Sequence, residues 1–311
     1  MDATAVARFE AGRARLASLA YRLLGSAADA EDVVQDAFLR WQAADRERIE
    51  VPEAWLTKIV TNLCVDRLRS AQARHERTAG GWLPEPLLDG DPMLGPADTA
   101  EQRESVSMAV LLLLERLSPI ERAVYVLREA FSYSHAEIAG ILDITESASQ
   151  QHLHRARRRV ATGRRRDVVD HAEARRVVKA FLDAAASGRT ERLVALLTAD
   201  ATGIADAGGL GGKPLVFPSP ERFAATIRGL FKPSDRKRRL IGGSPALYAG
   251  VANGSPALIA AIGDRVVSVL VLETHEGRIV HACGVSAPAR LGRFSAMWAR
   301  REHDAPLIEA W

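Results

Sequence analysis

Three helix-start signals lie between residues 118 and 160 and constrain the fold more than any other feature of the chain. Ser118 with Glu121, and Ser134 with Glu137, have the spacing of a capping box. In a capping box the serine hydroxyl accepts a backbone N–H of the first helical turn, and the glutamate accepts the N–H of the serine. Thr145 suits the cap of a third helix after a short turn. Helix, tight turn and helix together predict a helix-turn-helix.

The helix that begins after Thr145 is expected to present one polar face, because its amide, imidazole and guanidinium side chains recur at helical spacing: Gln150, Gln151, His154 and Arg155. Such groups can reach base edges in a major groove. Seven arginines lie between residues 155 and 166, a charge density that suits a phosphate backbone. A solvated basic helix is the alternative, but the capped helix pair favours DNA binding.

Length and composition exclude several classes of protein. A chain of 311 residues is long enough for two domains, and its formal net charge of +3 hides an arginine-rich stretch at 155–176 and an acidic one at 85–104. Cys64 and Cys283 are far apart, so neither a disulfide framework nor a cysteine zinc site is expected, and no cofactor or metal is predicted. No run reaches the roughly 18 to 20 apolar residues of a membrane span. We therefore expect a soluble protein of a reducing cytoplasm.

The first 70 residues predict packed helices with two distinct polar surfaces. Apolar residues at helical spacing over 4–42 break at Gly25 and Ser26, and Asp29, Glu31 and Asp32 then begin an acidic outer face. This face suits a basic partner surface, although a plain solvated helix start explains it equally well. A further helix begins at Pro52, and its polar residues suit nucleic acid: Lys58, Asn62 and Arg67.

Residues 78–100 are rich in Gly, Pro and Asp and are expected to form a linker. The linker contains Trp82, Leu83, Leu87 and Leu88, which are costly to leave in water, so we expect it to dock on another part of the protein. From residue 171 two amphipathic helices are followed by expected strands at 257–262, 265–273 and 278–285. This pattern predicts an α+β domain with a curved antiparallel sheet.

Two blocks of this sequence resemble the extracytoplasmic-function (ECF) sigma factors of bacteria. The first comprises DAEDVVQDAFLRW at 29–41 and AWLTKIVTNLCVDRLRS at 54–70, and the second spans 117–160. The chain is also similar to the subgroup that carries a C-terminal SnoaL-like domain with the NTF2 cone fold. The linker motif of that subgroup is present in full as Trp82, Leu83, Pro84, Glu85 and Pro86. Its two C-terminal motifs are present only in part, at 206–209 and 287–291.

The resemblance implies two all-α sigma domains followed by an α+β cone domain. The implied ranges are sigma region 2 at 1–77, the linker at 78–100, sigma region 4 at 101–166, the SnoaL-like domain at 171–295 and a tail at 296–311. The helix at 29–41 is then expected to bind the clamp helices of core RNA polymerase through Asp29, Glu31, Asp32, Gln35 and Asp36.

The resemblance also implies the promoter contacts. Lys58, Asn62 and the loop before Pro52 are assigned to the minus-ten element, and Arg67 is assigned to DNA binding. At the minus-thirty-five element Arg128 is expected to hold a phosphate, and the groove-facing residues are Gln150, Gln151, His154 and Arg155. Gln150 stands where arginine is more usual and Ser149 where an apolar residue is usual, so we expect an altered promoter preference and a more loosely packed helix.

The sequence therefore predicts an alternative sigma factor, not an enzyme, whose C-terminal domain regulates it in cis without a separate anti-sigma protein. In a second hypothesis the C-terminal domain is an enzyme or ligand sensor, with Asp206, His275 and His281 as acid–base groups. A third hypothesis, a helix-turn-helix repressor with a ligand domain, leaves the block at 29–70 unexplained.

Overall fold

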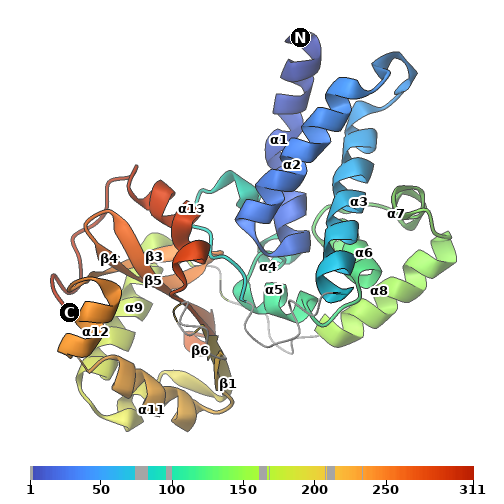
Figure 1. Ribbon diagram of the computed structural model, residues 1–311. Coiled ribbons are helices and arrows are strands. Elements are labelled where there is room, and N and C mark those ends of the chain that lie inside the picture. Colours follow the sequence, from blue (N-terminus) through green and yellow to red (C-terminus); the bar gives the residue numbers. More distant parts are fainter. Residues whose placement is uncertain are drawn as a thin grey trace. The chain divides into compact units, whose positions relative to one another are not determined.

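The computed structural model describes residues 3–73, 83–95, 100–160, 167, 169–206, 208, 214–232 and 234–311. The chain forms two compact units, each with its own core (Figure 1). The helical unit comprises residues 1–79 and 90–161, and the C-terminal unit comprises residues 80–89 and 162–311. The expected linker at 78–100 is therefore shared between the two units, with its first part assigned to the C-terminal unit.

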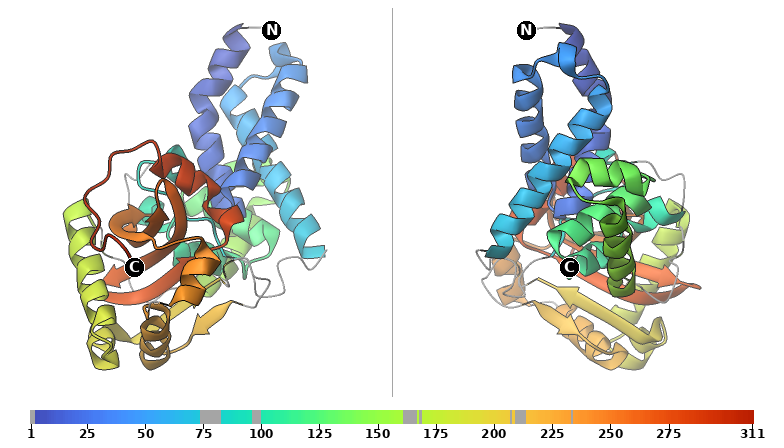
Figure 2. Two further views of the ribbon diagram at one scale, coloured as in Figure 1. Left: turned by 60° about the vertical axis from the view of Figure 1, so that its left-hand side comes forward. Right: turned by 90° about the vertical axis from the view of Figure 1, so that its right-hand side faces the viewer.

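Three long helices form the first part of the helical unit and lie side by side in both views of Figure 2: α1 (Ala3–Leu24), α2 (Ala27–Ala43) and α3 (Pro52–Ala73). A short 3-10 turn, η1 (Arg46–Arg48), precedes α3. Phe9, Leu23 and Trp41 are buried between the helices, and the Trp41 indole donates to the carbonyl of Ala5 at 2.9 Å. The apolar spacing of residues 4–42 thus forms the two packed helices that the sequence predicts.

Arg22 is buried inside the helical unit, with 1% of its surface exposed. Its guanidinium donates to the Ser105 hydroxyl and to the Leu94 carbonyl, both at 2.8 Å. Burial lowers the pKa of Arg22 to about 10. The side chain joins α1 to the segment that contains η2 (Pro92–Leu94), α4 (Ala100–Glu104) and α5 (Met108–Leu114).

The helix-turn-helix is formed by α6 (Pro119–Glu129), α7 (His135–Leu142) and α8 (Glu146–Val160). Both predicted capping boxes are confirmed, at Ser118 and at Ser134. The hydroxyl of Thr145 accepts the N–H of Ala148 at 3.1 Å, so the third cap is also present. Asp143 ends α7 in the left-handed conformation, with φ of 53°. Short-range capping therefore determines these three helix starts.

Ser149 is fully buried on the inner face of α8. Its hydroxyl lies 2.9 Å from Nδ1 of His135 on α7, so the polar atom has a partner inside the unit. Ser149 therefore makes a polar contact between α7 and α8 at the position where the sequence predicts looser packing.

The C-terminal unit contains one mixed sheet in the strand order β2-β1-β6-β5-β4-β3. Its strands are β1 (Leu197–Ala205), β2 (Leu215–Phe217), β3 (Ala246–Ala252), β4 (Ser255–Ile262), β5 (Arg265–His275) and β6 (Arg278–Val285). The three expected strands correspond to β4, β5 and β6. The sheet is not purely antiparallel, because β1 pairs with β6 in parallel. The sequence of β1, LTADATGIA, lacks regular apolar alternation and gives no sign of this strand.

Helices pack on this sheet and close its core. The α9 (His171–Ala186) and α10 (Thr190–Val194) helices precede β1, α11 (Pro220–Leu230) and α12 (Asp235–Ile241) lie between β2 and β3, and α13 (Pro288–Trp298) follows β6. Phe181 of α9 and Phe223 of α11 share one apolar core with Leu258 and Leu272 of the sheet. The α13 helix packs on β5.

The last residues of the chain add to this core. The expected boundary at residue 295 falls inside α13, and the segment beyond it folds back onto β3. The Leu307 N–H donates to the Leu247 carbonyl at 2.7 Å, and the Leu247 N–H donates to the Ile308 carbonyl at 2.8 Å. Trp311 packs against the same core. Residues 296–311 are thus partly structural, because their apolar side chains cover the β3 edge.

Candidate nucleic-acid and polymerase interface

The acidic face of α2 is positioned by the burial of its opposite side. Ser26 caps the helix by accepting the Asp29 N–H at 3.2 Å. Apolar residues of α2 point into the helical unit and are buried: Ala30, Val33, Val34, Ala37 and Trp41. The outward face then exposes the polar residues Glu31, Asp32, Gln35 and Asp36, while Asp29 is half-buried. Four of the five residues assigned to polymerase binding therefore share one exposed surface.

Arg67 of α3 lies against this acidic face. It donates to the Asp29 carbonyl at 3.0 Å, and its guanidinium lies 3.4 Å from the Asp32 carboxylate and 3.5 Å from that of Asp29. The structure therefore brings Arg67 next to the residues assigned to polymerase, although the sequence assigns it to DNA. Arg67 lies 35 to 38 residues from Asp32 and Asp29 in the sequence, and helical periodicity does not predict contacts between residues so far apart.

Lys58 occupies a contact between α3 and the helix-turn-helix. Its ammonium lies 2.7 Å from a carboxylate oxygen of Asp143 and 2.9 Å from the Gly140 carbonyl. The Lys58 side chain is 39% exposed and that of Asp143 is 74% exposed, so this ion pair is largely solvated. Asn62 lies one turn further along α3 and is half-buried. In this arrangement the amine of Lys58 is already paired within the helical unit.

The polar face expected on α8 is exposed. Gln150, Gln151, His154 and Arg155 are all exposed, whereas Ser149, Leu153, Ala156 and Val160 are buried on the other side of the helix. The four predicted groove-facing residues therefore lie together on the outer side of one helix. Arg128 is half-buried near the end of α6, where its guanidinium donates to the Tyr133 carbonyl at 2.9 Å.

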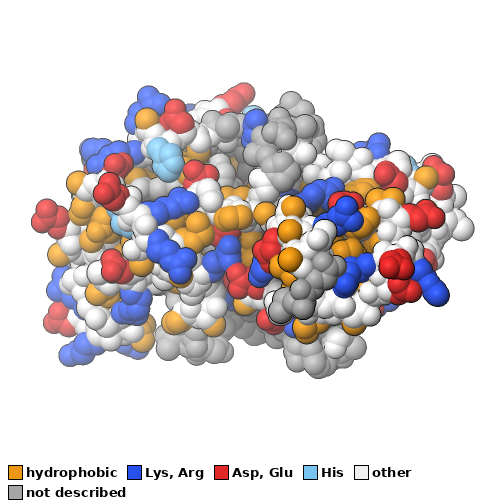
Figure 3. Space-filling view, turned by 90° about the horizontal axis from the view of Figure 1, so that it is seen from above, with side chains coloured by type: hydrophobic (Ala, Val, Ile, Leu, Met, Phe, Trp, Pro, Cys, Tyr) orange, Lys and Arg blue, Asp and Glu red, His pale blue; other side chains and the backbone are white. Residues whose placement is uncertain are grey.

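Several arginines of α8 are ion-paired with α6. Arg155 and Arg159 lie 2.9 and 2.6 Å from the two carboxylate oxygens of Glu121, and Arg157 lies 2.8 Å from Glu129. Burial raises the pKa of Glu121, but the hydrogen bonds from Ser118 and Arg155 and the charge of Arg159 outweigh it and hold that pKa below its usual range. These arginines thus join α8 to α6. Figure 3 shows acidic and basic side chains interspersed over the helical unit, in the right-hand part of the view.

Residues 83–89 of the linker pack into the C-terminal unit, whereas residues 90–95 belong to the helical unit. Leu83, Leu87 and Leu88 are 1%, 0% and 6% exposed, and Pro84 and Pro86 are buried with them. Glu85 is half-buried, and Trp82 lies outside the described residues. The apolar residues of the linker, which the sequence predicts to be docked, are therefore covered by the domain that follows helix α8.

Backbone hydrogen bonds fix the register of this docking. The Leu87 N–H donates to the side-chain oxygen of Asn253 at 2.8 Å, and the Asn253 N–H donates to the Leu87 carbonyl at 3.0 Å. Leu88 forms an antiparallel bridge with Ala252, and the Asp89 N–H donates to the Val251 carbonyl at 3.0 Å. The linker is therefore held at the β3 edge of the sheet by one antiparallel bridge and its flanking hydrogen bonds.

The two partly retained C-terminal motifs converge on the linker and on the start of α13. The Asp206 carboxylate accepts the N–H groups of Ser286 and Ala287 at 2.9 and 3.0 Å, which fixes the chain just before α13. Arg290, in the first turns of α13, donates to the Leu83 carbonyl. The aspartate of the first motif and the basic residue of the second are thus the parts that contact the backbone here.

The groups considered for acid–base chemistry are not brought together. Asp206 binds backbone N–H groups, and the His281 Nδ1 lies 3.1 Å from the Thr202 hydroxyl. Because Asp206 follows Thr202 by four residues, it lies about 13 Å further along an extended chain. His275 is the last residue of β5, whereas Asp206 lies beside Ser286, beyond the far end of β6. Asp206 is thus occupied by backbone N–H groups and His281 lies against Thr202, so the three predicted groups do not form one acid–base site.

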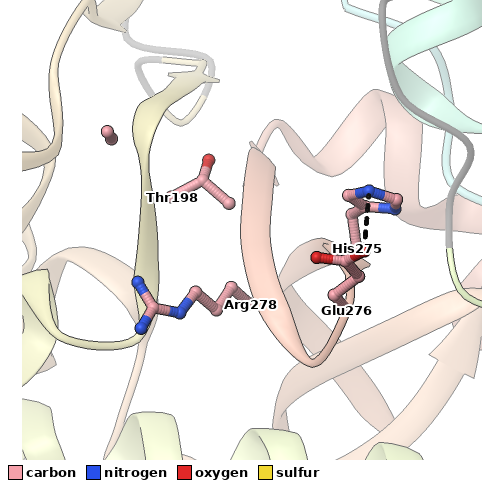
Figure 4. A pocket seen from close by; sticks show the side chains of 5 residues that line it. Thr198, His275, Glu276 and Arg278 are labelled. Atoms are coloured by element: carbon pink, nitrogen blue, oxygen red, sulfur yellow. Dashed lines mark ion pairs between the residues drawn. The ribbon is translucent and has the colours of Figure 1, made fainter.

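An open pocket of about 380 Å³ lies at the β5–β6 turn and is lined by Thr198, Ala199, His275, Glu276 and Arg278. Figure 4 shows that Arg278 extends to one side of the turn, while His275 and Glu276 extend to the other. His275 lies 4.0 Å from Glu276. Within the described ranges, no group of three or more His, Cys, Asp or Glu side chains is arranged to hold a metal ion. In the same part of the chain, no helix has the length and apolar character to cross a membrane.

Comparisons with known proteins match both units. Residues 8–74 match the family model for sigma-70 region 2, and residues 107–160 match that for sigma-70 region 4. The chain is 35% identical over 295 residues to the ECF RNA polymerase sigma factor SigJ of Mycobacterium tuberculosis, covering 94% of this chain and 90% of that protein. It is 32% identical over 290 residues to the probable ECF sigma factor SigI of the same species, covering 92% and 94%. The crystal structure of SigJ aligns with a TM-score of 0.67 and 29% identity over 93% of this chain and 98% of that one.

Proposed function

Because this chain belongs to the ECF sigma factors of RNA polymerase, we propose that its C-terminal α+β unit regulates promoter-specific initiation in cis through the docked linker. The helical unit carries the sigma function itself: it binds core RNA polymerase and promoter DNA and directs the polymerase to specific promoters. The comparisons give no support to the repressor alternative. What remains to be assigned is the role of each surface.

The exposed face of α2 is the surface that we assign to core polymerase. Glu31, Asp32, Gln35 and Asp36 are exposed together on rigid helix, and their acidic character suits a basic surface. Lys58 and Asn62 are assigned to the minus-ten element, where capture of an unstacked base offsets a few kcal/mol of unstacking. We assign Arg67 to the support of the α2 face, because it is held by Asp29 and Asp32.

The outer face of α8 is assigned to the minus-thirty-five element. Gln150 and Gln151 present amides that can pair with adenine edges, and His154 and Arg155 can reach bases or phosphates. The Arg155 guanidinium pairs with the buried Glu121 of α6, so in this state it is engaged within the helical unit, as the Lys58 ammonium is. Arg128 is assigned to a phosphate contact, with its guanidinium oriented by the Tyr133 carbonyl.

The helical unit, as described, is a closed state. The Lys58 ammonium pairs with Asp143 and Gly140, so these groups compete with promoter DNA for it. Tyr133 adds two further contacts between the same regions, with the Thr57 hydroxyl at 3.2 Å and with Arg15 at 3.1 Å. The solvated Lys58–Asp143 pair contributes little to stability, on the order of 1 kcal/mol or less. Core polymerase is therefore able to separate these elements when it binds.

The single observation that carries the cis-regulation proposal is the burial of the linker in the C-terminal unit. The linker joins α3 to the helix-turn-helix, so docking it fixes the length of chain available between the two sigma regions. Release of residues 83–89 frees that length, and docking restrains it. This device needs no separate anti-sigma protein, and we expect none. It also assigns the C-terminal unit a regulatory role, not a catalytic one, in the cytoplasm where polymerase and DNA meet.

Run-off transcription with purified core polymerase tests the proposal. The full chain is compared with a version that ends at residue 167, on promoters selected from a genomic library, together with core binding by each form. We expect promoter-dependent transcripts from both forms and a severalfold difference between them. Equal transcription and equal core binding would refute regulation in cis while leaving the sigma function intact.

A further inference from the structure

The α11–α12 region of the C-terminal unit carries more positive charge than the whole chain has in net terms. Between residues 220 and 241 there are seven cations, Arg222, Arg228, Lys232, Arg236, Lys237, Arg238 and Arg239, against two acids, Glu221 and Asp235. Seven minus two gives a local charge of +5, whereas the formal net charge of all 311 residues is +3. A charge this concentrated requires an explanation beyond solubility.

Five of these cations are exposed and lack an acidic partner among the described residues: Arg222, Arg228, Lys232, Arg236 and Arg239. The two acids of the segment are engaged elsewhere. The Glu221 carboxylate accepts the Ser219 hydroxyl at 2.8 Å, and that hydrogen bond lowers the pKa of Glu221. Asp235 lies 3.7 Å from Arg238. On α9, by contrast, Arg176 and Lys179 pair with Glu173 and Asp183.

Lys237 holds the two helices together. Its ammonium donates to three carbonyl groups at the end of α11, those of Gly229 at 2.6 Å, Leu230 at 3.0 Å and Lys232 at 2.6 Å. Desolvation and the nearby charge of Lys232 lower the pKa of Lys237. The start of α12 is thereby fixed beside the end of α11, and the backbone that carries Arg228, Lys232 and Arg236 is held in place. A preorganised set of cations loses less conformational entropy on binding an anion.

The chain also limits where this surface can be during initiation. Helix α8 ends at Val160 and α9 begins at His171. The ten residues between them, 161–170, span at most about 35 Å when fully extended. The C-terminal unit is therefore tethered close to whatever DNA the outer face of α8 reads. Tethering at this range gives a weak site a high effective concentration on the same DNA molecule.

We propose that the exposed cations of α11 and α12 bind the phosphate backbone of duplex DNA that flanks the element read by α8. Four of the five are arginines, whose guanidinium groups match phosphate geometry. An anionic membrane is a poorer match, because the exposed large apolar residues of α11 and α12 themselves are Leu230 and Leu240, too few for an interfacial helix. The contact carries no base specificity and adds affinity to a promoter chosen by other residues.

The test replaces three of the cations in the full-length chain. The variant R228Q/R236Q/R239Q is assembled with core polymerase, and its promoter affinity is measured against salt concentration on two duplexes. One duplex ends just beyond the minus-thirty-five element, and the other extends about two helical turns further. The matched control, R176Q/K179Q/R300Q, removes three exposed cations of the same unit outside α11 and α12.

We expect the wild type and the control to gain affinity and salt dependence on the longer duplex. Each phosphate neutralised contributes about 0.9 to the slope of log affinity against log salt. The variant should have a slope smaller by about 2 to 3. The ratio of wild-type to variant affinity should therefore fall roughly 40-fold between 50 and 200 mM salt. On the short duplex the three proteins should agree.

Equal slopes for variant and wild type on the long duplex would overturn the proposal. An equal loss on both duplexes, together with weaker core binding without DNA, would also overturn it and would identify an acidic surface of polymerase as the partner. Loss of binding to anionic lipid vesicles without loss of DNA affinity would overturn it in favour of a membrane. The measurement rests on the sigma function and is separate from cis-regulation, which equal transcription by the truncated chain would refute.

Discussion

The substitution Leu87→Ala perturbs the linker at its most buried position. The side chain is 0% exposed and lies within the C-terminal unit, although its residue belongs to the segment that leads into the helix-turn-helix. Removing the buried methyl and methylene groups of a leucine costs about 2 to 5 kcal/mol. Because each 1.4 kcal/mol is a factor of ten in an equilibrium constant, the released state of the linker should gain roughly 30-fold to several thousand-fold.

Hydrogen exchange of the linker amides measures this change. The Leu87 and Asp89 N–H groups are bonded to Asn253 and to Val251 in the wild type, so they exchange only when the linker is released. Exchange of residues 83–89 should accelerate by the factor above, while β4 and β5 stay protected. The control Leu240→Ala removes a leucine that is 62% exposed and should leave the linker unchanged. Unaltered exchange in the Leu87 variant would refute the reasoning, as would uniform acceleration across the whole unit.

Three further predictions concern single side chains. Asp143→Asn removes the partner of Lys58, so the free energy of unfolding should change by less than about 1 kcal/mol and core affinity should rise up to about fivefold in a fluorescence titration; a fall in affinity would contradict the closed-state account. Glu121→Gln should destabilise the helical unit by about 1 to 3 kcal/mol at neutral pH. The pKa of Glu121 is lowered in the folded protein, so its charge stabilises the fold above the ordinary pKa and this contribution is lost as the pH falls through the lowered value. In thermal melts the difference in stability between variant and wild type should therefore shrink as the pH is lowered. A difference that does not change with pH would argue against the ion pairs. Burial raises the pKa of Cys64 and of Cys283, so neither thiol should alkylate at pH 8 until the protein is denatured, which mass spectrometry of the labelled protein detects.

The features that depend on neighbouring residues in the sequence are those that the sequence predicts well. Ser118 and Ser134 find their partners three residues away, so both capping boxes form as expected. The short apolar runs of β4 to β6 define three strands joined by short turns. The acidic face of α2 and the polar face of α8 also follow from helical periodicity, because the buried residues opposite them are apolar.

The features that depend on distant partners were not predictable. Arg22 stands in an amphipathic helix like any surface arginine, but it is buried among groups that lie 72 to 83 residues away in sequence. The pairing of Lys58 with Asp143 spans 85 residues and changes the state of a predicted DNA contact. The linker is visibly apolar, yet nothing near it indicates that Asn253, 166 residues away, receives it. Packing of separate segments decides each of these cases, and periodicity carries no information about it.

The central claim is that docking of the linker on the C-terminal unit regulates a sigma factor in cis. Run-off transcription by core polymerase with the wild type, with Leu87→Ala and with Leu240→Ala tests it most directly, because the first substitution releases the linker while every domain stays in the chain. The account predicts that Leu87→Ala differs severalfold from wild type in promoter-dependent transcript and that Leu240→Ala does not. Equal transcript from all three, with linker release in the Leu87 variant verified by hydrogen exchange, would contradict it.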